Sequence, residues 1–308
     1  MGFPAIDALW LSPWVLGLLG LCIGSFLNVV IHRLPRMMER QWWHDGVAQL
    51  GDAESWQRTA GQALPPAAAP LATQMARTLE ALPPYSLARP ASACPACGHR
   101  IRWYENLPLL SWLALRGRCS ACGTGIPVRY PLVELLTAVL FALAAWRFGP
   151  APVSLAWCAV LATLVALTAI DLDTMLLPDS LTLPLLWAGL LAALAGWTLP
   201  LPTAVVGAVV GYLSLWSVYW LFKLVTGKEG MGHGDFKLLA ALGAWLGWQA
   251  ILPIVLMSSV IGATVGIALK LSGRLGSGRP MPFGPFLAGG GIAVILLGTQ
   301  RVLGWIGQ

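Results

Sequence analysis

Uncharged apolar runs dominate the sequence, and two of them are too long for the core of a water-soluble domain. Residues 180–222 contain no Asp, Glu, Lys or Arg over 43 positions, and residues 238–269 contain none over 32. About 20 apolar residues in a helix cross the roughly 30 Å of hydrocarbon in a bilayer. Charged residues make up only 10% of the chain, against about 25% in soluble domains. The sequence therefore predicts an all-α polytopic membrane protein and excludes disordered, collagen-like and disulfide-rich secreted chains.

About eight transmembrane helices are expected from the apolar runs. The first is a retained helix rather than a signal peptide, because it lacks a basic n-region and its apolar stretch is too long. A Pro-rich break at residues 198–202 divides residues 180–222 into two spans, and Gly247 and Pro253 mark a turn that divides residues 238–269. The other expected spans are residues 8–31, 131–148, 152–170 and 282–299.

Lysine and arginine are distributed unevenly between the loops, and this sets the expected orientation. If the segment after the first span is cytoplasmic, the cytoplasmic regions hold 17 of the 19 basic residues, and only Arg147 and Arg301 lie outside. The net charge of +6 then reflects basic residues that face an anionic lipid leaflet, so membrane lipids and no nucleic acid are the expected contacts. The predicted organisation is a first transmembrane helix (1–31), a cytoplasmic loop (32–130) and a membrane-embedded core (131–308).

The first part of the cytoplasmic loop, residues 37–93, is expected to be loosely organised. Residues 64–70 form an Ala/Pro linker without regular structure. Apolar residues at positions i, i+4 and i+8 predict a short amphipathic helix over residues 71–82. We interpret this helix as a packing or membrane-surface element.

The second part of the loop carries a predicted metal site. Two C-x2-C pairs with 21 residues between them supply four thiols, from Cys94, Cys97, Cys119 and Cys122. Four thiolates suit tetrahedral zinc, and a site with sulfur in every position is structural rather than hydrolytic. Disulfides or free thiols are the alternative, but structural disulfides are rare in the reducing cytosol. We therefore expect a zinc-ribbon-like loop with one Zn2+ per chain, and interpret Cys22 and Cys158 as apolar residues within spans.

Carboxylates beside hydrocarbon are costly and are candidates for function. Asp171, Asp173 and Asp179 lie between the third and fourth expected spans, and Asp235 lies between the fifth and sixth. The expected topology places both segments on the cytoplasmic face, where two acids can share one proton and act as base and acid in peptide hydrolysis. A helix cap or an interfacial charge is the alternative for each acid. We expect Asp179 to be the N-cap of the fourth span and Asp173 to be structural.

Several motifs occur in order along the chain, from residue 24 to the last span. They are GSFLNVVIHRLP at 24–35, the two cysteine pairs, WYENLPLLSW at 103–112, LRGRC at 115–119, RYPLVE at 129–134, the Asp171 segment and GHGD at 232–235. Together they resemble the motifs of type IV prepilin peptidases, the bifunctional leader peptidases and N-methyltransferases of pilus and type II secretion systems. The last element also resembles presenilin-type intramembrane aspartyl proteases, which lack the cysteine loop.

The resemblance implies an active site and a substrate. The catalytic residues of the family fall on Asp171 and Asp235, with Gly232, Gly234, Lys237 and Asp173 in supporting positions. The glycines permit close backbone approach around Asp235. The implied substrate is a prepilin or pseudopilin with a short basic leader, cut at the cytoplasmic face of a bacterial inner membrane. His233 stands where the family is expected to have Tyr or a small residue, and we interpret it as a bystander.

N-methylation with S-adenosylmethionine is implied by the resemblance alone, because the chain has no glycine-rich dinucleotide fingerprint. Gly117 matches a glycine that is linked to methylation in the family. Glu105 and Glu134 are further candidates for contact with the cofactor or the substrate amine. For Glu134, a structural partnership with an Arg is equally consistent with the sequence.

Two other functions remain open from the sequence. The chain can be a non-catalytic membrane assembly protein whose zinc loop docks pilus or secretion machinery, in which case both aspartates are dispensable. It can also be a protease that has lost methylation. The sequence does not reveal the oligomeric state, because the Gly207 and Gly211 small-xxx-small pair is common inside packed bundles.

Overall fold

The computed structural model describes residues 9–273 and 281–306. Within these ranges the regular structure is helical, with two isolated β-bridges in the cysteine loop. The amino-terminal half contains α2 (Pro13–Gly51), α3 (Ala53–Ala60), α4 (Ala68–Glu80), η1 (Trp103–Asn106), α5 (Leu110–Ala114) and α6 (Arg129–Phe148). The carboxy-terminal half contains α7 (Pro152–Thr174), α8 (Asp179–Leu194), α9 (Leu201–Thr226), α10 (His233–Leu246), η2 (Trp248–Ala250), α11 (Ile251–Leu271), α12 (Gly284–Leu297) and α13 (Thr299–Ile306). Arg274 and Arg279, which contribute to the charge argument, lie outside the described residues.

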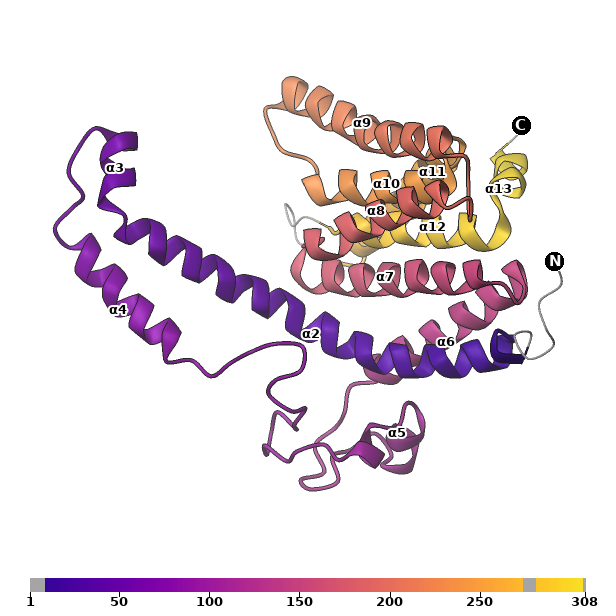
Figure 1. The fold of residues 1–308 in the computed structure, drawn as a ribbon, viewed down its shortest axis with the longest axis horizontal. Coiled ribbons are helices and arrows are strands. Elements are labelled where there is room, and N and C mark those ends of the chain that lie inside the picture. Colours follow the sequence, from indigo (N-terminus) through magenta and orange to yellow (C-terminus); the bar gives the residue numbers. More distant parts are fainter. Residues whose placement is uncertain (1–8, 274–280, 307–308) are drawn as a thin grey trace.

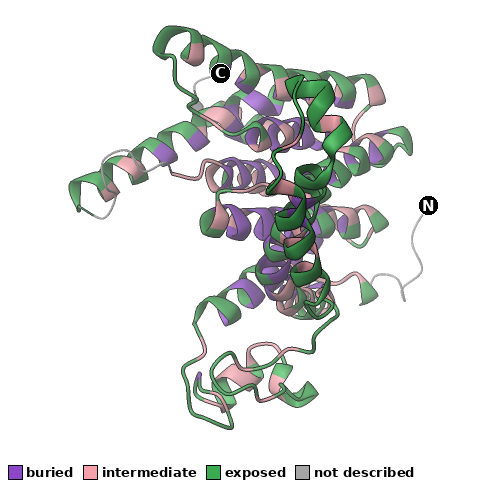
Figure 2. Cartoon of the chain, turned by 90° about the vertical axis from the view of Figure 1, so that its left-hand side faces the viewer, coloured by how far each residue is buried: buried purple, intermediate pink, exposed green. Residues whose placement is uncertain are grey.

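A bundle of helices forms the body of the molecule, and an arm and a loop project from it (Figure 1). The bundle runs from α9 on one side, through α10 and α12, to α7 and then the α2–α6 pair on the other side. Burial is concentrated in the bundle, whereas the arm and the loop are mostly exposed (Figure 2). Helix α7 is the central element, since 67% of its most apolar 18-residue window is buried, against 22% for α9.

Among the described residues, five helices are long and apolar enough to cross a membrane, and a sixth span results if the bent pair α12–α13 is counted as one. They are α2, α6, α7, α9 and the continuous η2–α11 segment. The protein is therefore a multi-pass membrane protein. Helices α8 and α10 are shorter, at 16 and 14 residues, so the expected count of eight stays a prediction.

The first helix does not end near Ile31 but continues to Gly51. Ser12 accepts a hydrogen bond from the Val15 amide and Pro13 occupies the first helical position, as is common at a helix start. Pro35 lies inside the helix without ending it. Residues 36–50 contain no further proline, and their charged and long side chains favour helix, so the helix extends out of the bundle as an arm.

Helix α4 packs against this arm and contains most of the amphipathic helix expected at residues 71–82. It begins at Ala68, inside the expected linker, and its buried residue is Ala72. The side chain of Leu71 remains exposed. Met75 and Leu79 are half-buried, as the apolar spacing predicts, whereas Ala72 takes the inward place expected for Leu71.

Glycines bring α9 and α10 into close antiparallel contact. A Cβ atom at Gly207 would lie 2.2 Å from the carbonyl oxygen of Gly243, and one at Gly211 would lie 2.5 Å from that of Leu239. The small-xxx-small pair therefore packs two helices of the same chain. The turn expected near Gly247 is present, because Gly247 has φ +82° and separates α10 from η2.

Candidate active site and metal site

Asp171 and Asp235 come together at one end of the bundle. Asp171 lies in the last turn of α7, and Asp235 lies in the first turn of α10. Both residues are buried, with exposed fractions of 5% and 7%. Gly284 contacts both the Asp171 carboxylate and Leu177, and Leu177 contacts Gly234, the residue before Asp235. Two acids 64 positions apart in the sequence are thus brought into one buried site.

A third segment, which the sequence analysis missed, completes this site. The backbone amide of Gly284, the first residue of α12, donates a 3.0 Å hydrogen bond to Oδ2 of Asp171. The first amides of a helix have no partner within the helix, and they favour an anionic acceptor. Leu177 packs against Gly284 and also against Gly234, the residue before Asp235. Leu177 therefore lies between the backbones that hold the two acids.

Asp235 is set back from the end of the neighbouring helix. The pairing of Gly207 with Gly243 and of Gly211 with Leu239 places Asp235 at the level of Leu215. Helix α9 continues for 11 residues beyond that level, to Thr226, which is about 16 Å. Among the described residues, Oδ1 of Asp235 has no hydrogen-bond partner. This buried oxygen therefore keeps its capacity to accept a hydrogen bond.

The charged residues in supporting positions form ion pairs that connect helices around the two acids. Lys237 of α10 contacts both carboxylate oxygens of Asp179 at 2.7 Å. Arg129 of α6 contacts both oxygens of Asp173 at 2.7 Å and also donates to the carbonyl of Ala169. Each pair therefore joins a helix that carries one buried acid to a second helix.

Asp179 is not the N-cap of its helix, contrary to our expectation. Pro178 holds that position, and Asp179 is the first residue of α8, without a side-chain bond to the helix amides. Its carboxylate binds Lys237 instead. The ammonium group of Lys237, from α10, takes the place of the backbone amides of α8 as the partner of Asp179. The position of Asp179 in the sequence does not reveal this tertiary contact.

The glycines and the histidine around Asp235 have different surroundings. A Cβ at Gly234 would lie 2.8 Å from Cβ of Leu177, whereas one at Gly232 would have ordinary contact with Asp235. The His233 ring lies 5.2 Å from the ring of Tyr219 and 5.3 Å from that of Phe236. His233 therefore packs in an aromatic cluster at the α9–α10 junction.

The four cysteines of the loop form a group that can hold a metal ion. Their sulfur atoms all lie within 4.8 Å of one another, and the Cys94 and Cys122 sulfurs are 3.8 Å apart. Tetrahedral zinc with bonds of about 2.3 Å places sulfurs about 3.8 Å apart, so the donor set fits zinc. Each pair is closed by a β-bridge, Ala93 with Arg100 and Arg118 with Gly125.

The thiols cannot all ionise without a cation. The hydroxyl of Thr124 lowers the pKa of Cys122 to about 6, and the backbone amides of Cys97 and Ala96 lower the pKa of Cys94. The pKa of Cys97 is lowered by the amide of His99, but the neighbouring thiols, Cys122 first, raise it to about 12. A bound divalent cation removes this conflict, because it stabilises every thiolate.

Glu105 connects the two cysteine pairs. Its carboxylate accepts hydrogen bonds from the Ser120 hydroxyl and from the Arg102 amide, and it contacts the His99 ring at 3.2 Å. The Ser120 bond is the largest of the effects that lower the pKa of Glu105 to about 2. Glu105 is therefore ionised at neutral pH.

Glu134 and Gly117 have structural environments that differ from each other. Glu134 is buried in α6 and accepts the Leu109 amide at 2.8 Å, so its partner is the loop backbone rather than an Arg. Gly117 has φ +67°, and a Cβ there would lie 2.8 Å from the Trp112 ring. Trp112 in turn donates to the carbonyl of Ile126.

The cysteine loop is fastened to the membrane helices near the buried acids. Asn28 of α2 donates to the carbonyl of Tyr130, and buried Arg33 donates to the carbonyls of Ser86 and Leu87. Together with the Leu109–Glu134 and Arg129–Asp173 contacts described above, these bonds fix both ends of the loop. The loop and the two acids therefore belong to the same end of the molecule.

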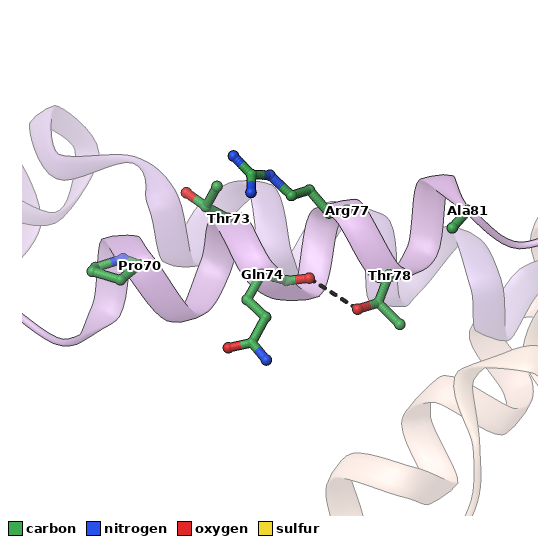
Figure 3. Close-up of a pocket in the computed structure, with 6 residues that line it drawn as sticks. All are labelled: Pro70, Thr73, Gln74, Arg77, Thr78 and Ala81. Atoms are coloured by element: carbon green, nitrogen blue, oxygen red, sulfur yellow. Dashed lines mark hydrogen bonds between the residues drawn. The ribbon is translucent and has the colours of Figure 1, made fainter.

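Three hollows on the described part of the surface lie away from the aspartate site. One, of about 650 Å3, lies along one face of α4 and its carboxy-terminal end, where Gln74, Arg77 and Thr78 line it (Figure 3). Its lining comes from this one segment, so it is a shallow surface. A second, of about 520 Å3, lies on the cysteine loop. A third, of about 410 Å3, lies between α2 and α4.

Comparison with known proteins gives a consistent result over most of the chain. Residues 18–148 match the family model of the bacterial peptidase A24 N-terminal domain, and residues 158–267 match that of the type IV leader peptidase family. A prepilin leader peptidase/N-methyltransferase of Aeromonas salmonicida is 52% identical over 298 residues, which cover 94% of this chain and 92% of the relative. Proteins with the same name from Pseudomonas aeruginosa and Burkholderia pseudomallei are each 50% identical, covering 92% of this chain and 89% and 85% of the relatives. No solved structure matches the chain.

Proposed function

Because the chain belongs to the type IV leader peptidase family, we propose that it removes the leader from prepilins and pseudopilins and then methylates the new amino terminus. The names of the relatives carry both activities. The peptidase activity is supported most directly by one observation: Asp171 and Asp235 lie in one buried site. No feature of the described residues favours a non-catalytic docking role over this one.

Cleavage would use the two acids as a dyad that shares one proton. Two neighbouring carboxylates cannot both ionise, so one is protonated and the other is not. The ionised acid takes a proton from a water molecule as the water oxygen attacks the peptide carbonyl, and the protonated acid donates to the carbonyl oxygen. Collapse of the tetrahedral intermediate then returns a proton to the leaving amine. The Gly284 amide would fix the orientation of Asp171 through these steps.

We propose that eight helices cross or enter the membrane: α2, α6, α7, α8, α9, α10, α11 and α12. Each corresponds to one apolar run of the sequence. The Lys and Arg distribution supports a cytoplasmic loop and a cytoplasmic dyad in a bacterial inner membrane. Helix α10 is short because it starts at the level of Leu215, so the dyad would lie within the apolar length of α9, near the inner leaflet.

The cysteine group would hold one structural zinc ion. Four sulfur donors leave no open position for a water molecule or a substrate, so the metal would stabilise the loop and take no part in hydrolysis. Two observations support this assignment: the short distances between the four sulfur atoms, and the raised pKa of Cys97, which shows that neighbouring thiolates repel one another unless a cation is bound. Metal analysis of purified protein should give about one equivalent, and Cys94→Ser with Cys97→Ser should abolish it.

Methyl transfer would take place on the cytoplasmic loop, with S-adenosylmethionine as the methyl source. When bound, this cofactor would supply an electrophilic methyl group, which the unprotonated amine would accept with loss of one proton, leaving the demethylated thioether as the other product. The anchoring of the loop by Glu134 and Arg129 supports delivery of the cleaved amino terminus from the dyad to the loop.

The peptidase proposal is tested by Asp171→Asn and Asp235→Asn, each of which keeps the size of the side chain and removes the acid. Both variants should retain metal and thermal stability and should lose prepilin cleavage by at least about 1,000-fold, because no base or acid remains to complete the dyad. Asp45→Asn, on the exposed arm, is the matched control and should cleave normally. Normal cleavage by either dyad variant would refute the assignment and leave the docking role as the better account.

A further inference from the structure

One hollow on the cysteine loop has the features of a small-molecule site; we call it the α5 cavity. Its volume is about 520 Å3, within the roughly 300–1,000 Å3 of ligand pockets. Its lining combines polar and apolar side chains. The polar ones include Arg102, Tyr104 and Glu105, and the apolar ones include Ala114 and Leu115.

The α5 cavity presents groups of both charges and an aromatic ring. Glu105 is a carboxylate whose position is fixed by Ser120 and by the Arg102 amide. The Arg102 side chain reaches over the loop to the Tyr104 hydroxyl, with its guanidinium carbon 5.9 Å from the ring. A guanidinium recognises a carboxylate, a carboxylate attracts a cation, and an aromatic face can stack on a planar base.

The neighbouring hollow between α2 and α4 has similar residue types but offers less to a ligand. There the Arg40 side chain donates to the carbonyl of Pro83 at 2.9 Å and lies 4.7 Å from the Tyr85 ring. Its guanidinium is thus already engaged with the backbone and the ring. The α5 cavity, in contrast, has an arginine that contacts only a tyrosine side chain among the described residues.

The α5 cavity also lies on the part of the loop that is fastened next to the dyad. Helix α5 starts one residue after Leu109, whose amide binds Glu134 of α6. Arg129, at the start of the same helix, binds Asp173, two residues after Asp171. The loop segment that carries the cavity is therefore fastened to α6, and α6 is ion-paired to the end of α7 that carries Asp171.

We infer that the α5 cavity binds S-adenosylmethionine, with Arg102 at its carboxylate, Glu105 on the side of its sulfonium and Tyr104 against its adenine. This inference rests on the proposed methyl transfer and gives that activity a location. The chemistry of the donor set, one anion, one cation and one aromatic ring on a cavity of suitable size, is what supports it.

The test is ligand binding to the purified full-length protein with its metal content verified. Isothermal titration with S-adenosylmethionine and with its demethylated product, S-adenosylhomocysteine, needs no turnover. Arg102→Ala should weaken both ligands by about 10- to 100-fold, since a charge-assisted bond to the carboxylate is lost. Arg100→Ala, two residues away and outside the cavity lining, is the matched control and should bind normally.

Two further variants test the charge and the volume of the cavity. Glu105→Gln should weaken the cationic donor about fivefold more than the neutral product, because only the donor carries a sulfonium. Ala114→Phe fills the cavity and should abolish binding of both ligands, whereas Leu113→Phe, exposed and outside the lining, should not. Cleavage should persist in all of these variants, which shows that the dyad is intact.

The possible failures are distinguishable. If the parent protein binds the donor and the Arg102, Glu105 and Ala114 variants bind it equally well, the α5 cavity is not the site and the proposed methyl transfer stands. If the parent protein cleaves prepilin but neither binds the donor nor methylates, both the methyl transfer and this inference fail.

Discussion

The backbone amide of Gly284 binds Oδ2 of Asp171 across 113 positions of sequence, at 3.0 Å. This contact places the start of α12 directly on one of the two buried acids. There is no room for a side chain at this position, because a Cβ would lie 2.6 Å from the same oxygen and 3.1 Å from Leu177. The α12 terminus is thus a third component of the candidate active site, beside the ends of α7 and α10.

Gly284→Ala should therefore impair cleavage strongly. The methyl group would displace Asp171 or α12, and a misplacement of about 1 Å can cost about 100-fold in rate. We expect a loss of that size in prepilin cleavage, with a destabilisation of about 1–3 kcal/mol from overpacking. Cleavage assays and thermal unfolding in detergent measure the two effects separately.

The control for this variant is in the same helix. A Cβ added at Gly289 would have nothing within 4 Å, so Gly289→Ala should cleave normally and be as stable as the parent protein, or slightly more stable. If Gly284→Ala cleaves at the parent rate, the amide contact has no role in positioning Asp171.

The sequence locates the two acids but not this third component. Asp171 and Asp235 stand out because carboxylates are rare beside apolar spans, and charge bias places them on one face. Gly284 contributes only a backbone amide, which every residue except proline has, so its role depends on tertiary packing. Asp179 shows the same limit, since its position after Pro178 suggests an N-cap, but Lys237 from a distant helix takes its carboxylate.

The extent of the first helix illustrates a different limit. Apolar composition predicts which part of α2 is covered by lipid, but not where the helix stops, because residues 36–50 mix charged and polar side chains with apolar ones and still favour helix. The clustering of the four cysteines, in contrast, is predicted correctly from their spacing. The two members of each pair are local in sequence, so the spacing within a pair brings their sulfur atoms together.

The Lys237–Asp179 pair should contribute more to the position of α10 than to overall stability. Both side chains are partly exposed, at 31% and 55%, and exposed ion pairs stabilise by about 1 kcal/mol or less. Lys237→Met should leave the unfolding temperature nearly unchanged and reduce cleavage by about fivefold or less. The difference in cleavage rate from the parent protein should shrink at high salt, because salt screens the ion pair in the parent protein. Cleavage rates at two ionic strengths measure this.

A double variant tests whether the two residues act as a pair. Adding Asp179→Asn to Lys237→Met should cause no further loss, since the interaction is already absent. Lys270→Met, at the end of α11 and outside any described ion pair, should behave as the parent protein. Additive losses from Lys237→Met and Asp179→Asn would show that the residues act independently.

The glycine contact between α9 and α10 should be essential for folding. At Gly207 the nearest atom to an added Cβ is a backbone oxygen of Gly243, at 2.2 Å, and backbone atoms cannot move aside without separating the helices. Gly207→Ala should destabilise the protein by about 1–3 kcal/mol and lower cleavage with it, because α10 carries Asp235. Gly304→Ala, with open space around it, should be neutral. An altered oligomeric state with unchanged thermal stability would show that this glycine faces a second copy instead.

Gly117 should separate methylation from cleavage. Any side chain there is strained by the positive φ of +67°, and it would also meet the Trp112 ring at 2.8 Å. Gly123 has nearly the same φ, +74°, but a Cβ added there would have nothing within 4 Å. Both alanine variants therefore carry a backbone strain of about 1–2 kcal/mol. Only Gly117→Ala adds a clash with a side chain, so comparing the two variants separates the clash from the strain. Gly117→Ala should displace Trp112 and with it α5, which lines the α5 cavity.

We therefore expect Gly117→Ala to lose methylation and donor binding by at least about 10-fold, while cleavage stays within about twofold of the parent protein, because the dyad lies on other helices. Mass spectrometry of the mature pilin amino terminus gives methylation and cleavage in the same measurement. Gly123→Ala should retain both activities. Equal losses of methylation in the two variants would mean that strain in the cysteine loop, rather than the packing of Trp112 of α5 against Gly117, controls the methyl transfer.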